Sequence, residues 1–169
     1  MPYYEDMKVL AIDPGYGRCG IAVLEKTSHG EHLVYSDCIE TAAADDFGER
    51  IAAIASMVES AIAEYVPDCM AIEKLFFAKN QKTAMRVAEV RGALIHIATE
   101  RDIPVFEYAP AQVKSATTGS GNADKQQIAS MVRLLVTIEK QIQYDDEYDA
   151  IAIGITHLAR SKTLLARSQ

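Results

Sequence analysis

The chain has 169 residues, a formal net charge of −7 and three cysteines. This length suits one domain that buries a core without help from disulfides or structural metals. Cys19, Cys38 and Cys69 are too few and too widely spaced for a disulfide framework or a zinc knuckle, so we expect them to be small residues in or near the core. No apolar run is long enough to span a membrane, and the acidic first residues do not resemble a signal peptide, which predicts a cytoplasmic protein.

The charge is distributed unevenly along the chain. Residues 1–73 carry 4 basic and 14 acidic side chains, whereas residues 74–133 carry 9 basic and 5 acidic ones. A basic middle within an acidic protein indicates one face that attracts a polyanion such as nucleic acid. An ordinary solvated helix surface would have the same composition, and charge alone leaves both interpretations open.

The first half of the chain predicts a strand meander, a helix and a further strand. Val9–Ile12 is a continuous apolar run, typical of a strand buried on both faces, and Pro14 and Gly15 turn the chain after it. In order, the apolar runs and turns predict strands at 9–12, 19–24 and 32–40, a helix at 47–65 capped by Asp45 or Asp46, and a strand at 69–72. Because a helix connects the buried strands, a right-handed crossover should make the last strand parallel to the first.

The second half is mostly helical. Its patterns predict a helix at 81–99, a strand at 104–108, a short helix opened by Pro110, a helix from Asp124 to Leu135, and an almost entirely apolar last helix after 143–145. A helix that is apolar on all sides is normally buried. The predicted fold class is therefore α/β, with a mixed five-stranded sheet, made of an antiparallel three-strand meander plus parallel strands, flanked by helices.

Four carboxylates stand where these elements begin or end. Asp13 and Glu73 each follow a buried strand, so two parallel strands would place them at the same edge of the sheet. Asp146 and Asp149 lie three residues apart at the start of the last helix, where their side chains share one face. The alternative is that Asp145, Asp146 and Glu147 form a simple capping cluster, because acidic groups are favoured at a helix N-terminus, and that Asp149 is a surface residue one turn in.

Such a cluster of carboxylates repels itself unless cations neutralise it. Oxygen ligands without nearby histidine or cysteine favour Mg²⁺ or Mn²⁺ over zinc. A pair of these ions activates water and stabilises the leaving oxygen in phosphodiester hydrolysis. The sequence therefore predicts a metal-dependent nuclease with two ions, with Asp13 as the ligand that bridges them.

Six local motifs, in this order, resemble the RuvC family of Holliday-junction resolvases. They are Ile12–Gly15 (IDPG), 73–80 (EKLFFAKN), Arg91–Gly92, 112–114 (QVK), 121–125 (GNADK) and 146–157 (DEYDAIAIGITH). The match covers about residues 7–160. It implies a single RNase H-like nuclease domain over 1–160, and we expect residues 161–169 to form a frayed tail.

The resemblance also implies an activity, partners and site residues. It implies a homodimer that makes paired nicks in four-way DNA junctions during recombination and repair, and that works with a branch-migration helicase motor. Its metal-binding catalytic residues are Asp13, Glu73, Asp146 and Asp149, and its DNA-binding positions are Phe76, Lys79, Arg91, Lys114 and Lys125. Two places depart from the family pattern, the turn Tyr16–Gly20 and Tyr148 between the last two aspartates.

Simpler roles remain open for several of these residues. Phe76 would also serve as a core residue, and Lys114 as a surface lysine. Lys125 opposes the helix dipole, which calls for a neighbouring carboxylate or phosphate. We expect His157, on the apolar helix, to be a packed structural histidine. Gly92 in the second long helix suggests close packing against a neighbour. The helix carries Ala84, Ala88 and Gly92 at four-residue spacing, which makes it a candidate dimer interface, and packing on the sheet would suit the same small residues.

Three other functions compete with junction resolution. A nuclease of the same fold would act on an RNA–DNA hybrid, and a binding protein would hold junctions without cutting them. The third alternative interprets Asp13-Pro14-Gly15 as the phosphate loop of an actin-like ATPase, but that architecture needs two lobes and a longer chain.

Overall fold

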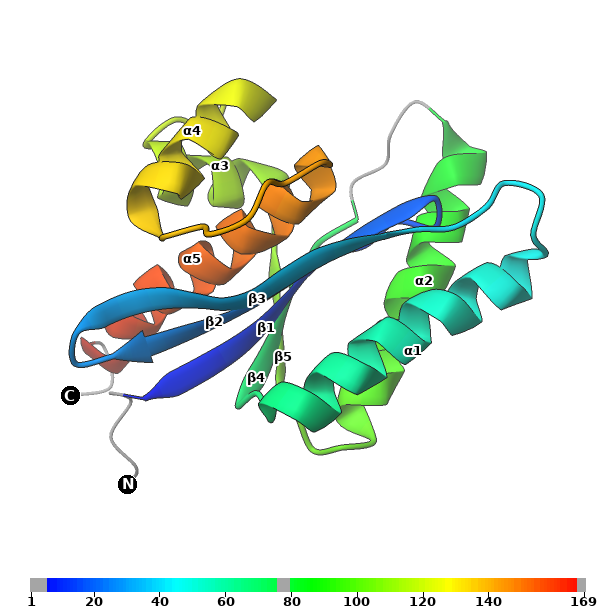
Figure 1. Cartoon of the computed structure of the whole chain (residues 1–169), viewed down its shortest axis with the longest axis horizontal. Helices are drawn as coiled ribbons and strands as arrows, with labels where there is room; N and C mark the ends of the chain where they lie inside the picture. The colour runs from blue at the N-terminus through cyan, green and yellow to red at the C-terminus, as the bar shows by residue number, and fades with distance from the viewer. Residues whose placement is uncertain (1–5, 76–79, 167–169) are drawn as a thin grey trace.

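The computed structural model describes residues 6–75 and 80–166, with side chains described as far as residue 161 in the last helix. One mixed sheet of five strands runs through the centre, in the order β3-β2-β1-β4-β5 (Figure 1). The strands are β1 (Met7–Asp13), β2 (Arg18–Thr27), β3 (Gly30–Glu40), β4 (Cys69–Glu73) and β5 (Val105–Tyr108). β1, β2 and β3 form an antiparallel meander, and β4 and β5 continue the sheet in parallel to β1. The predicted fold class is confirmed.

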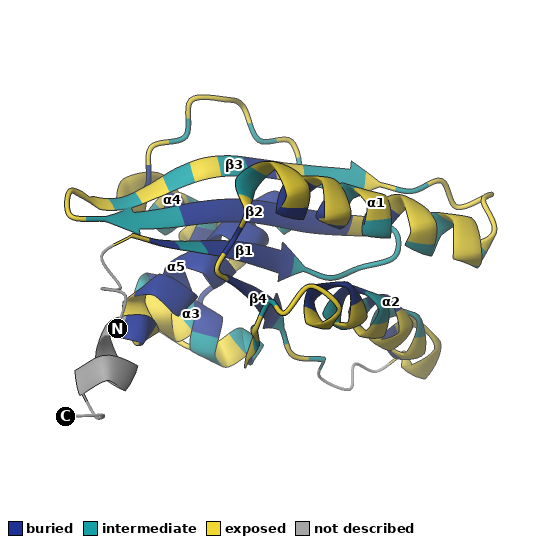
Figure 2. Ribbon diagram, turned by 90° about the horizontal axis from the view of Figure 1, so that it is seen from below, coloured by how far each residue is buried: buried dark blue, intermediate teal, exposed yellow. Residues whose placement is uncertain are grey.

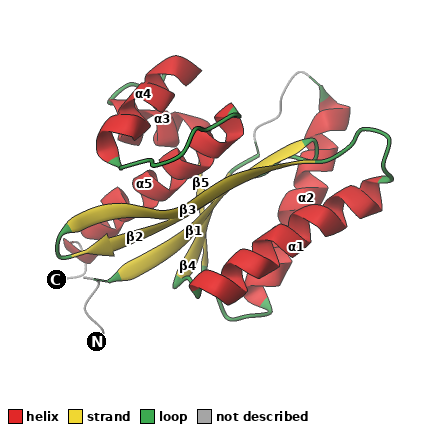
Figure 3. Cartoon of the chain, in the orientation of Figure 1, coloured by secondary structure: helices red, strands yellow, loops and turns green. Residues whose placement is uncertain are grey.

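The described residues form five helices, which cover the two faces of this sheet (Figures 1 and 3). They are α1 (Phe47–Tyr65), α2 (Gln81–Thr99), α3 (Pro110–Thr118), α4 (Lys125–Leu135) and α5 (Asp145–Ala166). α1 and α2 pack on one face, and α5 packs on the other with α3 and α4 outside it. The sheet therefore separates two hydrophobic cores.

The central strands are apolar on both faces because both faces are covered. Val9 and Ala11 of β1 contact the α5 side, whereas Leu10 and Ile12 contact the α1 and α2 side, and all four are fully buried. Figure 2 shows the contrast with α1 and α2, which expose one side to solvent. A continuous apolar run, rather than an alternating one, is the pattern of such a doubly covered strand.

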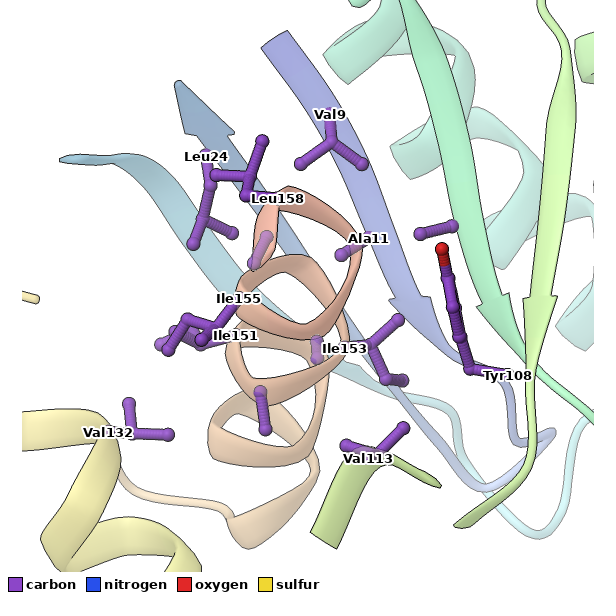
Figure 4. Close-up of a cluster of buried hydrophobic side chains, with 14 of the residues drawn as sticks. Val9, Ala11, Leu24, Tyr108, Val113, Val132, Ile151, Ile153, Ile155 and Leu158 are labelled. Carbon is purple, nitrogen blue, oxygen red and sulfur yellow. The ribbon is translucent and has the colours of Figure 1, made fainter. Parts of the chain in front are cut away.

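Helix α5 is the centre of the second core. Every residue from Ala150 to Leu158 is buried, and Figure 4 shows α5 between the sheet, Val113 of α3 and Val132 of α4. Gly154 permits this approach, because a Cβ there would lie 2.3 Å from Leu24 Cδ1. The apolar pattern of the helix thus predicted its burial correctly.

α5 continues to Ala166, so helical backbone extends past residue 160. The frayed tail over 161–169 stays a prediction. One expectation about local structure needs correction. Gly92 does not mark a close contact within the chain, because a Cβ there would meet nothing within 4 Å. In the part of the chain that the structure describes, no helix has the length and hydrophobicity needed to cross a membrane.

Candidate metal centre

Asp13 and Glu73 end two neighbouring parallel strands. β1 and β4 pair with Ile12 opposite Ile72, so the residue that follows on each strand reaches the same edge of the sheet. Both carboxylates are partly buried at that edge. The predicted juxtaposition of Asp13 with Glu73 is confirmed, and it follows from the crossover through α1.

The first turn of α5 brings Asp146 and Asp149 to the same place. Gly20 is the strand partner of Asp13, and a Cβ on Gly20 would lie 1.9 Å from the carbonyl oxygen of Asp146. Only a glycine lets the helix start so close to β2. The contact places the N-terminal turn of α5 directly beside the end of β1. We call Asp13, Glu73, Asp146 and Asp149 the carboxylate cluster.

Burial and mutual repulsion perturb the protonation of this cluster. Burial, followed by the charges of Glu73, Asp149 and Asp146, raises the pKa of Asp13 well above its usual range. Burial raises the pKa of Glu73 to about 7, with a further contribution from Asp149. Burial likewise raises the pKa of Asp149 to about 6, although Lys125 opposes the shift. Each raised pKa means that burial and the neighbouring carboxylates disfavour the ionised form of the side chain.

Two lysines and two residues of the carboxylate cluster line one small cavity. It has a volume of about 290 Å³, and its lining includes Glu73, Asp149, Lys114 and Lys125. Lys125 Nζ also lies 2.6 Å from Asp145 Oδ2, which supplies the carboxylate neighbour expected for a lysine at a helix N-terminus. The two basic side chains therefore stand beside the carboxylate cluster, on α3 and α4.

Arg91 lies at the back of the same strand end. Its Nε donates a hydrogen bond of 2.8 Å to the backbone carbonyl of Glu73, and its terminal nitrogen pairs with Glu107. These contacts commit most of the guanidinium to the protein. In this structure Arg91 supports the end of β4.

A buried network fixes the first turn of α5 and was not anticipated. Glu147, only 4% exposed, accepts a hydrogen bond of 2.6 Å from Ser36 Oγ and pairs with Lys140 Nζ at 2.7 Å. From the sequence, Glu147 was only a member of a capping cluster at the helix N-terminus. The sequence offered one indication of this buried position. Glu147 follows Asp146 directly, and consecutive residues of a helix point to different faces, so Glu147 cannot share the face of Asp146 and Asp149. The network ties the first turn of α5 to β3.

The two departures from the family pattern leave the carboxylates in place. Tyr148 packs in the core at 8% exposure, with the Arg133 guanidinium 4.8 Å from its ring centroid. Arg18, from the unusual turn, lies 3.5 Å from Asp146 Oδ2. It also lies over the ring of Tyr144, at 4.9 Å. Arg18 is thus a cation beside the cluster that motif comparison did not single out.

His157 is the packed structural residue that its sequence position predicts. Its Nδ1 lies 2.8 Å from the Tyr108 hydroxyl and its Nε2 lies 3.2 Å from Cys69 Sγ, so both ring nitrogens have a partner. Burial lowers its pKa to about 4, which keeps the ring neutral. We call Cys69, Tyr108 and His157 the histidine cluster. Cys19 is also buried and Cys38 is half-buried, as expected.

The donor chemistry of the carboxylate cluster fits a hard divalent cation. All four side chains offer carboxylate oxygens, which are the ligands that Mg²⁺ and Mn²⁺ prefer. Burial and the neighbouring carboxylates raise the pKa values of Asp13, Glu73 and Asp149, and a bound cation would oppose both effects. Among the described residues, no three His, Cys, Asp or Glu side chains form a ready-made metal cage. Two predicted DNA-binding residues, Phe76 and Lys79, lie outside the described residues.

Comparison with known proteins gives the family. The family model described as crossover junction endodeoxyribonuclease RuvC matches residues 9–157. The RuvC protein of Petrotoga mobilis is 41% identical over 151 residues, which cover 89% of this chain and 93% of that protein. The RuvC protein of Brachyspira hyodysenteriae is 41% identical over 156 residues, covering 92% and 96%.

A solved structure agrees with the sequence relatives. Thermus thermophilus RuvC in complex with Holliday junction substrate superposes with a TM-score of 0.83 and 32% identity, covering 93% of this chain and 97% of that one. This agreement over most of both chains identifies the fold as the RNase H-like fold of RuvC. This chain belongs to the RuvC family of crossover junction endodeoxyribonucleases.

Proposed function

We propose that this chain is a metal-dependent, structure-selective endonuclease that resolves four-way DNA junctions by paired nicks in recombination and repair. The observation that carries the proposal is the carboxylate cluster, which three segments far apart in the sequence bring to one edge of the sheet. Membership of the RuvC family supplies the substrate class. The relative solved with Holliday junction substrate supports the same choice.

The residues of the carboxylate cluster would hold the metal, Mg²⁺ or Mn²⁺, as two ions. When bound, such ions activate water and stabilise the leaving oxygen of a phosphodiester. Asp13 is the proposed bridging ligand, because the charges of the other three carboxylates all act on it. Glu147 and Gly20 fix the first turn of α5, which carries Asp146 and Asp149, beside β2 and β3.

The basic residues around the cluster would orient the DNA. Lys114 and Lys125 line the cavity of Glu73 and Asp149, where they can contact phosphates next to the bond that is cut. Arg91 would act through Glu73, whose backbone it holds. The junction, rather than a base sequence, would be recognised through its shape and through two sites related by dimer symmetry.

Several parts of the wider proposal stay predictions. They are the homodimer, the branch-migration helicase motor as partner, the cytoplasmic location, the number of metal ions, and the DNA contacts of Phe76 and Lys79. Each follows from the family resemblance or from composition.

Incubation of the purified protein with a labelled mobile four-way junction tests the proposal. We expect symmetric nicks with Mg²⁺, none with EDTA, and none from the Asp13→Asn variant, which should still bind the junction. Cleavage by Asp13→Asn at the normal rate would contradict the metal site. Preferential cleavage of an RNA–DNA hybrid would change the substrate class, and binding without any cleavage would favour a junction-binding protein.

A further inference from the structure

A groove on another side of the carboxylate cluster has no assigned role. It has a volume of about 520 Å³, and the turn Gly15–Arg18 forms one wall. Thr41, Arg50 and Thr83 line the rest, and Asp146 reaches it from α5. The lysine cavity described above meets the cluster at Glu73 and Asp149 instead. The carboxylates therefore lie between two hollows of the surface.

Arg50, in the first turn of α1, is held in one orientation in this groove. Its Nε donates a hydrogen bond of 2.9 Å to Thr41 Oγ1, and its guanidinium lies 4.7 Å from the ring centroid of Tyr16. It also lies against the backbone of Gly17, where a Cβ would be 3.7 Å from its terminal nitrogen. A guanidinium fixed by stacking and one hydrogen bond loses little further entropy on binding an anion.

The turn that carries Tyr16 is itself fixed. The Thr41 hydroxyl donates to the carbonyl of Tyr16, and the Thr41 backbone N–H donates to the carbonyl of Gly17 at 2.8 Å. The ring of Tyr16 packs edge-on against Phe47 at 6.0 Å between centroids. The support under Arg50 is therefore rigid.

Among the residues that the structure describes, Arg50 lacks the carboxylate partner that several other arginines have. Four other arginines pair with acidic side chains, as Arg18–Asp146, Arg86–Glu89, Arg91–Glu107 and Arg101–Glu59. Within the described residues, no carboxylate forms an ion pair with Arg50. Glu40, which also lines the groove, accepts a hydrogen bond of 2.7 Å from the Tyr144 hydroxyl. The terminal N–H groups of Arg50 are thus available to an anion.

We propose that this groove binds a backbone phosphate of the junction next to the bond that is cut, with Arg50 as its ligand. The inference rests on the proposed function, because it names where the same DNA strand continues past the metal centre. Guanidinium groups bind phosphate oxygens through two parallel hydrogen bonds. The Thr83 hydroxyl lines the same groove and can donate a further one. The metal centre then lies between Arg50 on one side and Lys114 and Lys125 on the other.

Junction binding by Arg50 variants tests this subsite. Measurements in an Asp13→Asn background separate binding from cleavage. We expect Arg50→Ala to raise the Kd about tenfold and to lower the slope of log K against log salt by about one for each Arg50 in contact with DNA. Arg50→Lys should keep the slope and recover part of the affinity. Arg101→Ala is the matched control, because Arg101 pairs with Glu59 away from the groove.

Neutral phosphates then locate the contact. A series of junctions is made, each with one methylphosphonate at a different position around the cut. At one position the substitution should weaken junction binding by the parent protein but cause no further loss of binding by Arg50→Ala. An unchanged Kd and slope in Arg50→Ala would overturn the subsite while cleavage by the native protein still supports the proposed function. A lower unfolding temperature with an unchanged slope would also overturn it, since Arg50 would then only support the turn. Failure of the native protein to bind or cut junctions would refute the proposed function itself.

Discussion

The histidine cluster and the carboxylate cluster both join α5 to the parallel strands. They differ in whether their buried polar groups have partners within the chain. In the histidine cluster every polar group has a partner, and a lowered pKa keeps His157 neutral. In the carboxylate cluster, raised pKa values show that burial opposes the charges of Asp13, Glu73 and Asp149. One cluster is complete within the chain and the other needs a cation.

The difference teaches how to separate structure from function in buried polar groups. A satisfied neutral cluster stabilises the fold and asks for no ligand. A cluster of like charges costs stability, and a protein retains it where the chemistry requires it. Mutations should therefore affect stability at the histidine cluster and activity at the carboxylate cluster.

The largest effect is expected from Glu73→Gln, which keeps the shape of the side chain and removes its charge. Cleavage should fall by at least about a thousandfold, while the unfolding temperature in EDTA should rise because repulsion is relieved. Single-turnover cleavage and calorimetry measure the two effects. Glu89→Gln, an exposed carboxylate on α2, is the control. Normal cleavage by Glu73→Gln would contradict the assignment of Glu73 to the metal site.

Gly20→Ala should disturb the carboxylate cluster without touching a carboxylate. The new Cβ would meet the carbonyl oxygen of Asp146 at 1.9 Å, so α5 must shift. We expect a loss of about 1–3 kcal/mol in the free energy of unfolding and about a hundredfold loss in cleavage rate. Gly48→Ala is the matched control, since a Cβ there meets nothing within 4 Å. Similar urea unfolding and cleavage in both variants would contradict the close contact.

Tyr108→Phe should have the opposite profile to Glu73→Gln. It removes the hydroxyl that lies 2.8 Å from His157 Nδ1 and leaves that nitrogen without its partner. The free energy of unfolding should fall by about 1–2 kcal/mol, and the cleavage rate at 25 °C should stay within about twofold. Urea unfolding beside a cleavage assay tests both. A large loss of cleavage in a folded variant would give the histidine cluster a part in the chemistry.

The smallest effect concerns pH and Mg²⁺. Glu73 and Asp149 have pKa values of about 7 and about 6 in the folded protein, above the ordinary 4.5 and 3.8. Because the folded state holds these protons more tightly, the metal-free protein loses stability from this cluster as pH rises through that window. Mg²⁺ binds the ionised form, so it should raise the unfolding temperature by about 3–5 °C at pH 8 and hardly at all at pH 5.

His157 responds to pH in the other direction, which the same measurement must separate. Its pKa is about 4 in the folded protein against an ordinary 6.5, so its stabilisation is complete above pH 6.5 and is lost as pH falls toward 4. The difference between Mg²⁺ and EDTA at each pH cancels this contribution. Glu73→Gln should reduce that difference at pH 8, and an equal Mg²⁺ effect at both pH values would contradict the assignment.

Periodicity and turn residues were enough to predict the sheet and its helices. The apolar run Val9–Ile12 predicted a doubly buried strand, and the apolar pattern of α5 predicted its burial, because hydrophobic pattern reports which faces are covered. The crossover rule then placed Asp13 beside Glu73 without any coordinates. The close contact expected at Gly92 was wrong, because a glycine on a helix does not by itself show what lies beside it.

Tertiary structure alone decided how the site is held and what surrounds it. The approach of α5 to Gly20, the burial of Glu147 against Ser36, and the stacking of Arg50 on Tyr16 all join residues distant in sequence. No local sequence pattern encodes such contacts, because the helix or strand propensity of a residue is the same whether its side chain contacts a partner or solvent. Sequence thus determined which groups reach the edge of the sheet, and packing determined how they face one another there.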